Sequence, residues 1–479
     1  MKKISLSLTL ISTLLLLSSN LVAKNLQEQS FDDIDRMLDQ QFKQKTEEID
    51  SLYNAYTKAI DDAFNGVTKK IEVKWPKNVR LPTKSTWVGY SKNLQTRSIV
   101  DYQAGEVVIE TQVTNNDLSQ AKSKLEAMAE QLTAPTTVPI EELDIFSQAV
   151  NENLSKKGIQ PAIKPLENEN ILKRILPENK LLKIATVTIN KLNVVKEKAP
   201  LISSTKAKES LPTIIPAPTI VKPPTIGVAP AIVSSSTIDT SPAITLNANL
   251  PNQKPATTPE KLAIDAKEPT IKLDLVKTAD GSVLKMTIKF VNNYQKVLLA
   301  NNFDDVKKFS KKYGVAISVI LAIIETESSY NPRAISRVPA FGLMQLVPKT
   351  AGIDAHNYVH GQKKILSPDY LFDETNNLQL GTAYFKLLKS RYLRKIEDPK
   401  SRFYCAVSSY NTGVGNLAKT FTGKKNLSKA AKVINTMTAD EVYQFLLKNL
   451  PAEETRNYLK KIVNRRAKYV HFDSELKEI

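Results

Sequence analysis

The sequence predicts an α+β chain with an N-terminal α+β domain, a proline-rich linker and a mostly helical C-terminal domain. Apolar residues recur at helical spacing near the N-terminus, and two short strand-like stretches follow them with a glycine in between. Eleven of the 25 prolines fall in the segment from Pro200 to Pro259, and no aromatic residue occurs between Phe146 and Phe290. From Phe303 onward the apolar pattern is helical.

The chain has 479 residues, enough for two or three domains, and a formal net charge of +18. Such a charge suits an anionic polymer, namely nucleic acid, a membrane surface or a cell wall that carries carboxylates. A solvated lysine-rich surface with no partner is the alternative explanation. No nucleic-acid-binding motif accompanies the basic residues, so we expect no nucleic acid partner.

The first 23 residues have the pattern of a secretory signal peptide. Lys2 and Lys3 precede an apolar run from Ile4 to Leu17, and small residues lead to a cleavage site after Ala23. A retained transmembrane anchor is the alternative, although the apolar run is short for a bilayer. We therefore expect the chain in the periplasm, and association with a membrane stays open.

Residues 24–195 are predicted to form the N-terminal α+β domain. Apolar and aromatic residues at helical spacing predict a helix over residues 31–69. Residues 96–102 and 106–113 have the pattern of two strands in a hairpin, with a glycine at the turn. A second helix is expected over residues 116–132.

Residues 196–265 are predicted to be a semi-extended linker, because a segment rich in Pro, Ser, Thr and Ala buries too little surface to offset its ordering entropy. Such a linker would let one domain reach over an extended substrate, and a simple spacer is equally compatible with it. Residues 266–300 contain a second hairpin, with strands over 271–276 and 283–290, which we expect to complete a sheet with the first. Residues 301–479 form the helical domain.

A helix that is apolar on all sides is predicted to follow Ser318. Six apolar residues run without a break from Val319 to Ile324, which is typical of a buried helix. Ser318 is the expected N-cap. Asn331 is expected to cap the other end, since Pro332 cannot continue the helix.

Two acids, Glu325 and Glu327, interrupt this helix near its C-terminal end. Residues two apart on a helix point in different directions, so the two carboxyls have different surroundings. Burial and the negative end of the helix dipole both raise the pKa of a carboxyl at this position. A general acid at neutral pH requires such a shift, and an ordinary glutamate that reaches solvent is the alternative.

The residues around Glu327 form four blocks in a recognisable order. The blocks are Glu327-Ser328-Ser329-Tyr330-Asn331-Pro332, Gly342-Leu343-Met344-Gln345, Ser409-Tyr410-Asn411-Thr412-Gly413 and Glu454-Thr455-Arg456-Asn457-Tyr458. Glu327, Ser336 and Gln345 fall nine residues apart. This set resembles the soluble-type lytic transglycosylase domain, which is related in fold to goose-type lysozyme. The resemblance covers about Asn302 to Val470.

The resemblance implies an enzyme that cuts peptidoglycan between N-acetylmuramic acid and N-acetylglucosamine and forms 1,6-anhydromuropeptides. Glu327 is then the acid and base, with no cofactor and no metal. The substrate-binding residues that it implies are Ser336, Gln345, Tyr410, Tyr458, Met344 and Asn411, and Gly342 would permit a close backbone approach. A helix cap or a buried hydrogen bond is the structural alternative for each polar residue among them.

The N-terminal part is similar to the N-terminal domain of membrane-bound lytic murein transglycosylase C, around Asn93-Leu94-Gln95-Thr96-Arg97-Ser98. The chain departs from that subfamily in having no lipid-accepting cysteine and a longer linker. Val338-Pro339 replaces small residues before Gly342, and Ser409 stands where alanine is usual. Peptidoglycan strands are the expected partner, and a complex at the outer membrane or cell wall stays open.

Two rival functions remain. A lysozyme would use the same cleft and the same glutamate with water as the nucleophile, and a wall-binding protein would carry an inactive domain. Outside the four blocks, His356 and His360 share helical spacing beside Asp354, but nearby glycines favour a loop over a metal site.

Other polar and charged residues have simpler explanations. Cys405 is expected to be a buried core thiol. Asp373 and Glu374 suit the start of a helix. The basic pairs Lys460-Lys461 and Arg465-Arg466 are expected to contact the wall or a membrane surface.

Overall fold

The computed structural model describes residues 31–133, 142–159, 270–278, 281–290 and 294–476. The expected signal peptide and linker lie outside these residues, so both remain predictions. The described residues all belong to one compact unit. None of the helices among the described residues combines the length and the apolar character that a membrane span requires.

The predicted first helix is present as α2, Phe31–Glu72. Its second half buries an apolar face against α4, Ile145–Ser155, a helix that the sequence patterns missed. The rings of Phe64 and Phe146 lie 4.4 Å apart between centroids, and the Asn153 side chain donates a hydrogen bond of 3.1 Å to the Ala59 carbonyl. Asp144 caps α4 by accepting from the Ser147 backbone.

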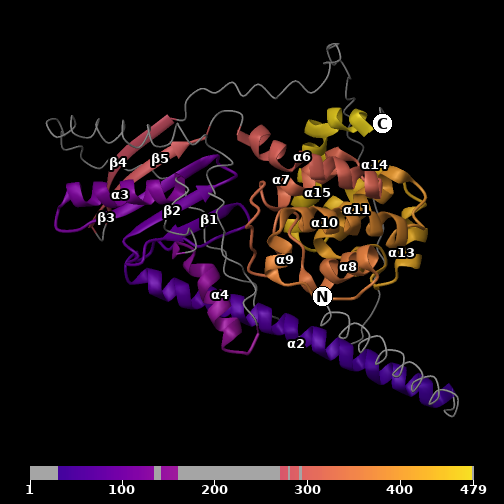
Figure 1. Ribbon diagram of the computed structural model, residues 1–479. Helices are drawn as coiled ribbons and strands as arrows, with labels where there is room; N and C mark the ends of the chain where they lie inside the picture. Colours follow the sequence, from indigo (N-terminus) through magenta and orange to yellow (C-terminus); the bar gives the residue numbers. More distant parts are fainter. Residues whose placement is uncertain (1–30, 134–141, 160–269, 279–280, 291–293, 477–479) are drawn as a thin grey trace, which may run out of the picture. The chain divides into compact units, whose positions relative to one another are not determined.

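Five antiparallel strands form one sheet in the order β1-β2-β3-β5-β4 (Figure 1). Their bounds are Thr86–Tyr90, Thr96–Asp101, Glu106–Val113, Thr270–Thr278 and Gly281–Lys289, from β1 to β5. Both predicted hairpins are therefore confirmed, and so is their union, because β3 pairs with β5 along its whole length. β1 was not predicted. The second predicted helix is α3, Leu118–Thr133, which packs on β3.

A buried ion pair lies between β2 and β3. Arg97 is fully buried, and its Nε donates to the Glu110 carboxylate at 2.7 Å. The Arg97 guanidinium also lies 3.8 Å from the centroid of the Trp75 ring and donates to the Asn78 carbonyl. The pair therefore ties the sheet to the segment that follows α2.

The C-terminal part is helical, as predicted, and its first helix begins at Tyr294, earlier than the predicted Phe303 (Figure 1). Its α-helices are α6 Tyr294–Tyr313, α7 Ile317–Glu327, α8 Ile353–His360, α9 Pro368–Phe372, α10 Glu374–Leu387, α11 Pro399–Thr412, α12 Val414–Thr422, α13 Leu427–Ile434, α14 Ala439–Asn449 and α15 Glu453–Tyr469. Short π-helical turns cover Pro348–Gly352 and Leu388–Tyr392, and a 3-10 segment covers Val470–Leu476. The α+β prediction with a helical C-terminal domain is thus confirmed.

Helix α7 is buried along its length, with every residue but Thr326 removed from solvent. The prediction that Ser318 is its N-cap was wrong: Ala316 holds that position and offers no side-chain hydrogen bond. Asp473 caps the helix from a distant segment instead, accepting from the Ser318 backbone at 2.8 Å and from its hydroxyl at 2.6 Å. A carboxylate at a helix N-terminus also matches the helix dipole.

Removing one partner of the Arg97–Glu110 pair should destabilise the fold. In the variant Glu110→Ala the Arg97 guanidinium stays buried without its carboxylate, which costs about 3–5 kcal/mol. The control is Glu142→Ala, which removes an exposed ion pair with Lys92 and costs roughly 1 kcal/mol or less. Urea denaturation of both variants measures the difference, and equal losses would contradict this account of the sheet.

Candidate active site

Glu327 lies at the C-terminal end of α7 and is only 5 % exposed. The apolar residues that precede it hold the helix in the core, so the carboxyl has little access to water. Burial raises the pKa of Glu327 above its ordinary value, and this is the largest influence on it. The exposed-glutamate alternative is therefore wrong.

Three side chains from other elements act on the Glu327 carboxyl. The Lys84 ammonium lies 3.6 Å from Glu327 Oε2 and lowers the pKa of Glu327, against the effect of burial. The Tyr458 hydroxyl acts in the same direction. Glu454, on the first turn of α15, raises the pKa of Glu327 by like-charge repulsion.

The chain turns sharply after Glu327. Ser328 caps α7, and its hydroxyl donates to the Ile324 carbonyl at 3.1 Å. Ser329 and Tyr330 both have positive φ, 52° and 68°, a conformation that non-glycine residues rarely adopt. Strained backbone of this kind concentrates at functional sites, which agrees with the position of this turn beside Glu327.

Asn331 has a different role from the predicted helix cap. Its Oδ1 accepts from the Arg333 backbone at 3.0 Å, and its Nδ2 donates to the Lys84 carbonyl at 3.2 Å. The prediction was wrong because the helix ends before the strained turn. Asn331 instead joins this turn to the segment before β1.

Two tyrosines are buried around Glu327. Tyr410, on α11, donates a hydrogen bond of 2.9 Å to the Met344 carbonyl. The Tyr458 hydroxyl, on α15, is buried and has no hydrogen-bond partner of good geometry among the described residues. Burial comes first and the Glu327 charge second in raising the pKa of both tyrosines, so the two rings remain neutral near the carboxyl.

The loop from 334 to 346 folds back on itself, with Phe341 bridging to both Ile335 and Leu346. Gly342 has a φ of 72°, and a Cβ there would meet the Leu371 carbonyl oxygen at 2.3 Å. The expected close approach is therefore real. It explains why this loop requires glycine at position 342.

Gln345 and Met344 end this loop. Gln345 has a φ of 47°, and its Nε2 donates to the Ala334 and Gly342 carbonyls at 3.0 and 3.1 Å. Its Oε1 is buried without a partner among the described residues. The Met344 side chain is fully buried, and its backbone N–H donates to Asn377 Oδ1 at 2.8 Å.

Ser336 and Asn411 both make structural contacts. The Ser336 hydroxyl donates to the Val338 carbonyl and accepts from the Ala340 backbone, so it shapes its own loop. Asn411 Oδ1 accepts from the Thr455 hydroxyl at 2.7 Å and joins α11 to α15. Among the predicted substrate-binding residues, Tyr458 acts on the Glu327 carboxyl directly, whereas Tyr410 is buried near it and bonds to the Met344 carbonyl.

No sequence pattern identified Lys84 as a residue of the site. It precedes β1 and lies 243 positions before Glu327 in the sequence, and no motif surrounds it. A single lysine in a basic chain gives no local signal of contact with a distant acid. Glu454 stood within a recognised block, but its position in the block did not reveal its influence on Glu327.

Glu325 is buried and paired, not an exposed acid. Its carboxylate lies 3.0 Å from Lys468 and 3.4 Å from Arg465, and the Tyr469 hydroxyl donates to it at 2.5 Å. Arg465 therefore faces inward, and Arg466 lies over the Phe403 ring at 4.8 Å. Both arginines hold α15 against its neighbours, and their expected contact with a wall or membrane surface stays a prediction.

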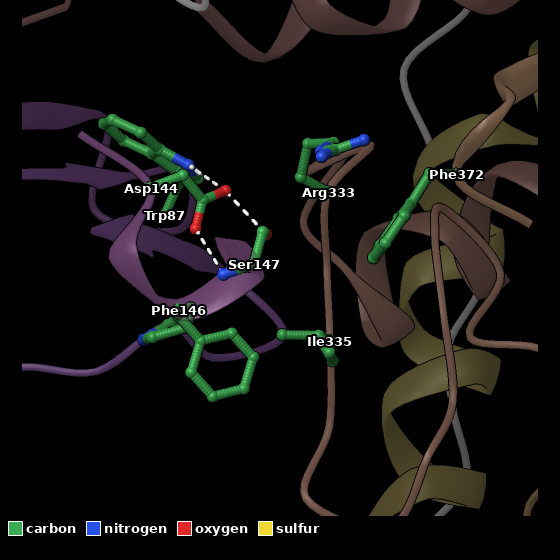
Figure 2. A pocket seen from close by; sticks show the side chains of 8 residues that line it. Trp87, Asp144, Phe146, Ser147, Arg333, Ile335 and Phe372 are labelled. Carbon is green, nitrogen blue, oxygen red and sulfur yellow. Dashed lines mark hydrogen bonds between the residues drawn. The ribbon is translucent and has the colours of Figure 1, made fainter. Parts of the chain in front are cut away.

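A pocket opens beside the turn that follows Asn331 (Figure 2). Trp87 and Ser147 both donate hydrogen bonds to Asp144 on one side, at 3.4 and 2.8 Å. Arg333 faces them from the other side and stacks over the Phe372 ring at 4.5 Å. Desolvation lowers the pKa of Arg333.

The histidines that were expected in a loop lie on helix α8. His356 Nδ1 bonds to the Gln362 carbonyl at 2.8 Å, and Tyr392 donates to Asp354 at 2.7 Å. No group of three metal-ligating side chains occurs among the residues that the structure describes. Cys405 is fully buried, and burial raises the pKa of its thiol, as expected for a core residue.

Asp373 caps α10 by accepting from the Asn376 backbone at 2.7 Å. The expected capping role is confirmed.

Comparisons with known proteins agree with the motif blocks. Residues 304–433 match the family described as Transglycosylase SLT domain, and residues 53–161 match the family described as Membrane-bound lytic murein transglycosylase C, N-terminal domain. A curated relative, Membrane-bound lytic murein transglycosylase C of Serratia proteamaculans, is 41% identical over 187 residues. The matched region is 39% of this chain and spans about half, 51%, of the relative. Both resemblances predicted from the sequence are confirmed.

Two solved structures show weaker likeness. An inactive mutant of Lytic Transglycosylase Slt from Pseudomonas aeruginosa is 25% identical with a TM-score of 0.27, over 35% of this chain and 23% of that one. The 70 kDa soluble lytic transglycosylase from Escherichia coli is 23% identical with a TM-score of 0.27, over 35% and 24% of the two chains.

The raised pKa of Glu327 makes folding stability depend on pH. The folded state favours the protonated carboxyl, so this contribution is complete below the unfolded-state pKa, near 4.5, and is lost as pH rises through the folded-state pKa. Glutamine cannot ionise. Glu327→Gln should therefore have a higher melting temperature than the wild type at pH 8, with the difference largely gone at pH 4.

Thermal unfolding across this pH range measures the effect, and Glu47→Gln on the exposed part of α2 is the matched control. A constant difference between Glu327→Gln and the wild type at every pH would contradict the burial argument.

Proposed function

We propose that this chain is a lytic transglycosylase that cleaves the β-1,4 bond between N-acetylmuramic acid and N-acetylglucosamine in peptidoglycan, with Glu327 as acid and base. The observation that carries the proposal is the buried Glu327 carboxyl, whose pKa burial raises, in the region that matches the Transglycosylase SLT domain. The name of the Serratia proteamaculans relative supports the same activity.

The first step is protonation of the leaving group. A carboxyl whose pKa is raised by burial holds its proton to a higher pH than an exposed glutamate, and it can donate that proton to the glycosidic oxygen as the bond breaks. The proton moves from Glu327 to the departing N-acetylglucosamine hydroxyl, and positive charge develops on the muramoyl ring. The muramoyl N-acetyl group supports this charge from the opposite face.

The second step closes a ring within the product. Glu327, now a carboxylate, accepts the proton of the muramoyl C6 hydroxyl, whose oxygen bonds to C1 and gives the 1,6-anhydro sugar. The nucleophile is already attached to the electrophile, so no water has to be positioned. A single carboxyl is sufficient for both steps, whereas most glycosidases use two.

The surrounding residues have supporting roles in this proposal. Gln345 Oε1 is buried without a partner among the described residues, and in this proposal it accepts a hydrogen bond from the muramoyl unit. Ser336 binds the same sugar from the rim of its loop. Tyr410 and Tyr458 orient the Glu327 carboxyl. Met344 holds Tyr410 in place, because its carbonyl accepts the hydrogen bond from the Tyr410 hydroxyl. Asn411 contacts α15, the helix that carries Tyr458.

The proposed location is the periplasm, where peptidoglycan lies. The signal-peptide pattern of residues 1–23 supports it, as does the match to a domain of a membrane-bound enzyme. Peptidoglycan is the proposed partner, and the excess of basic residues suits its carboxylates.

Mass spectrometry of products released from purified peptidoglycan tests the proposal. Wild type should release anhydromuropeptides, and Glu327→Gln should reduce release by at least roughly 10²–10⁴-fold, because the general acid and base is lost. Circular dichroism should show that the variant is folded. Full activity of Glu327→Gln would contradict the assignment of Glu327 as the acid and base.

The same spectra separate the rival functions. Hydrated reducing ends would establish a lysozyme, for which a second carboxylate must activate water. Glu454 is the described acid that influences Glu327, but its side chain is 75% exposed and lies 3.8 Å from Lys84. Glu454→Gln should therefore retain most of the activity. If neither the wild type nor Glu327→Gln releases products from peptidoglycan, the function of a wall-binding protein is favoured.

Tyr410→Phe should lower the rate roughly 10-fold to 100-fold, because the ring no longer bonds to the Met344 carbonyl and the geometry around Glu327 loosens. Tyr443→Phe, on α14, is the control for loss of a tyrosine hydroxyl. Initial rates on peptidoglycan compare the two variants. An equal effect of both substitutions would argue against a role for Tyr410.

A further inference from the structure

Lys84 is held in a tight turn directly before β1. The Thr83 hydroxyl accepts from the backbone N–H groups of Ser85 and Thr86, and the Thr83 N–H donates to the Thr86 carbonyl at 3.0 Å. The Tyr102 N–H donates to the Ser85 carbonyl at 2.9 Å. The backbone of Lys84 is thus fixed by the sheet of the N-terminal part.

The same residue reaches the catalytic glutamate. Its ammonium lies 3.6 Å from Glu327 Oε2 and 3.8 Å from Glu454 Oε1. Its carbonyl accepts from Asn331 Nδ2, in the turn that follows α7. Backbone and side chain therefore both contact the region around Glu327.

We propose that Lys84 is a positioning residue for the reaction, and that the N-terminal domain completes the catalytic site by placing this ammonium against the Glu327 carboxyl. The inference rests on the proposed function, and it assigns to the N-terminal domain a direct part in the chemistry.

The groups that face Glu327 come from helix α11, helix α15 and the turn before β1. Tyr410 on α11 and Tyr458 on α15 are neutral, and Glu454 on α15 is negative. Among the described residues, Lys84 is the cation within ion-pair distance of Glu327.

The cations on the other side of α7 are already engaged. Arg465 and Lys468 pair with Glu325, which Tyr469 also contacts. Lys84 is therefore the group that offsets the cost of a buried carboxylate at position 327.

This offset matters in the reaction cycle. Burial favours the protonated form of Glu327 before it donates, and the carboxylate that forms as the glycosidic bond breaks needs a nearby positive charge. Without Lys84, the pKa of Glu327 would rise further, and the acid would be weaker. The ion pair also fixes the direction in which the carboxyl points.

Rates of product release as a function of pH test the inference. Lys84→Met should move the alkaline limb of the profile up by roughly one pH unit, since an opposite charge at this distance lowers a carboxyl pKa and the lysine is partly exposed. It should also lower kcat at the optimum roughly 10-fold. Lys84→Arg keeps the positive charge, so the alkaline limb of its pH profile should lie close to that of the wild type. Lys92→Met, which removes an exposed lysine of the same domain, is the matched control.

A substrate-free measurement keeps the inference separate from the proposed function. The pKa of the Glu327 carboxyl is read by carbon-13 NMR titration, with Glu327→Gln to assign its signal. A higher pKa in Lys84→Met and an unchanged pKa in Lys92→Met support the role of Lys84. Identical titrations in the wild type and Lys84→Met would overturn it, whether or not the protein cleaves peptidoglycan. Absence of products from the wild type would overturn the proposed function alone.

Discussion

The C-terminal part is arranged around one constraint, a carboxyl at the end of a helix that is buried on all sides. A carboxylate in such a place is costly to ionise, so Glu327 favours its protonated form. Each element packed against it adjusts that preference: α15 contributes Tyr458 and Glu454, and the turn before β1 contributes Lys84. The loop from 334 to 346 is held against α11 through Tyr410. The chemistry that we propose needs this balance, because one group must release a proton and then accept another.

The two glutamates of α7 have different roles because their surroundings differ. Glu325 and Glu327 are two positions apart and both buried, but Glu325 meets Arg465 and Lys468, together with the Tyr469 hydroxyl. It therefore holds α15 in place as part of an ion-pair network. Glu327 lies near two neutral tyrosines, the like charge of Glu454 and one partly exposed lysine, and burial has the largest effect and raises the pKa of its carboxyl.

The sequence predicted those features that depend on local pattern. Both hairpins, the long first helix, the buried helix α7 and the capping role of Asp373 follow from periodicity and turn residues. The features that it missed depend on contacts between distant segments. Asp473 caps α7 from the far end of the chain, and it accepts the hydrogen bond from the Ser318 backbone. The predicted N-cap at Ser318 was wrong because a local pattern contains no information about Asp473. Lys84 reaches Glu327 from a segment far away in the sequence, and its carbonyl accepts a hydrogen bond from Asn331. No pattern within a short window carries that information.

A crystal structure of the Glu327→Gln variant with a bound peptidoglycan tetrasaccharide tests the role of Glu327 most directly. We expect the side chain at position 327 to lie within hydrogen-bond distance of the glycosidic oxygen between N-acetylmuramic acid and N-acetylglucosamine, with Gln345 Oε1 bonded to the muramoyl unit. A glycan bound elsewhere on the protein, with the side chain at position 327 still enclosed and out of its reach, would contradict the assignment of Glu327 as the acid and base.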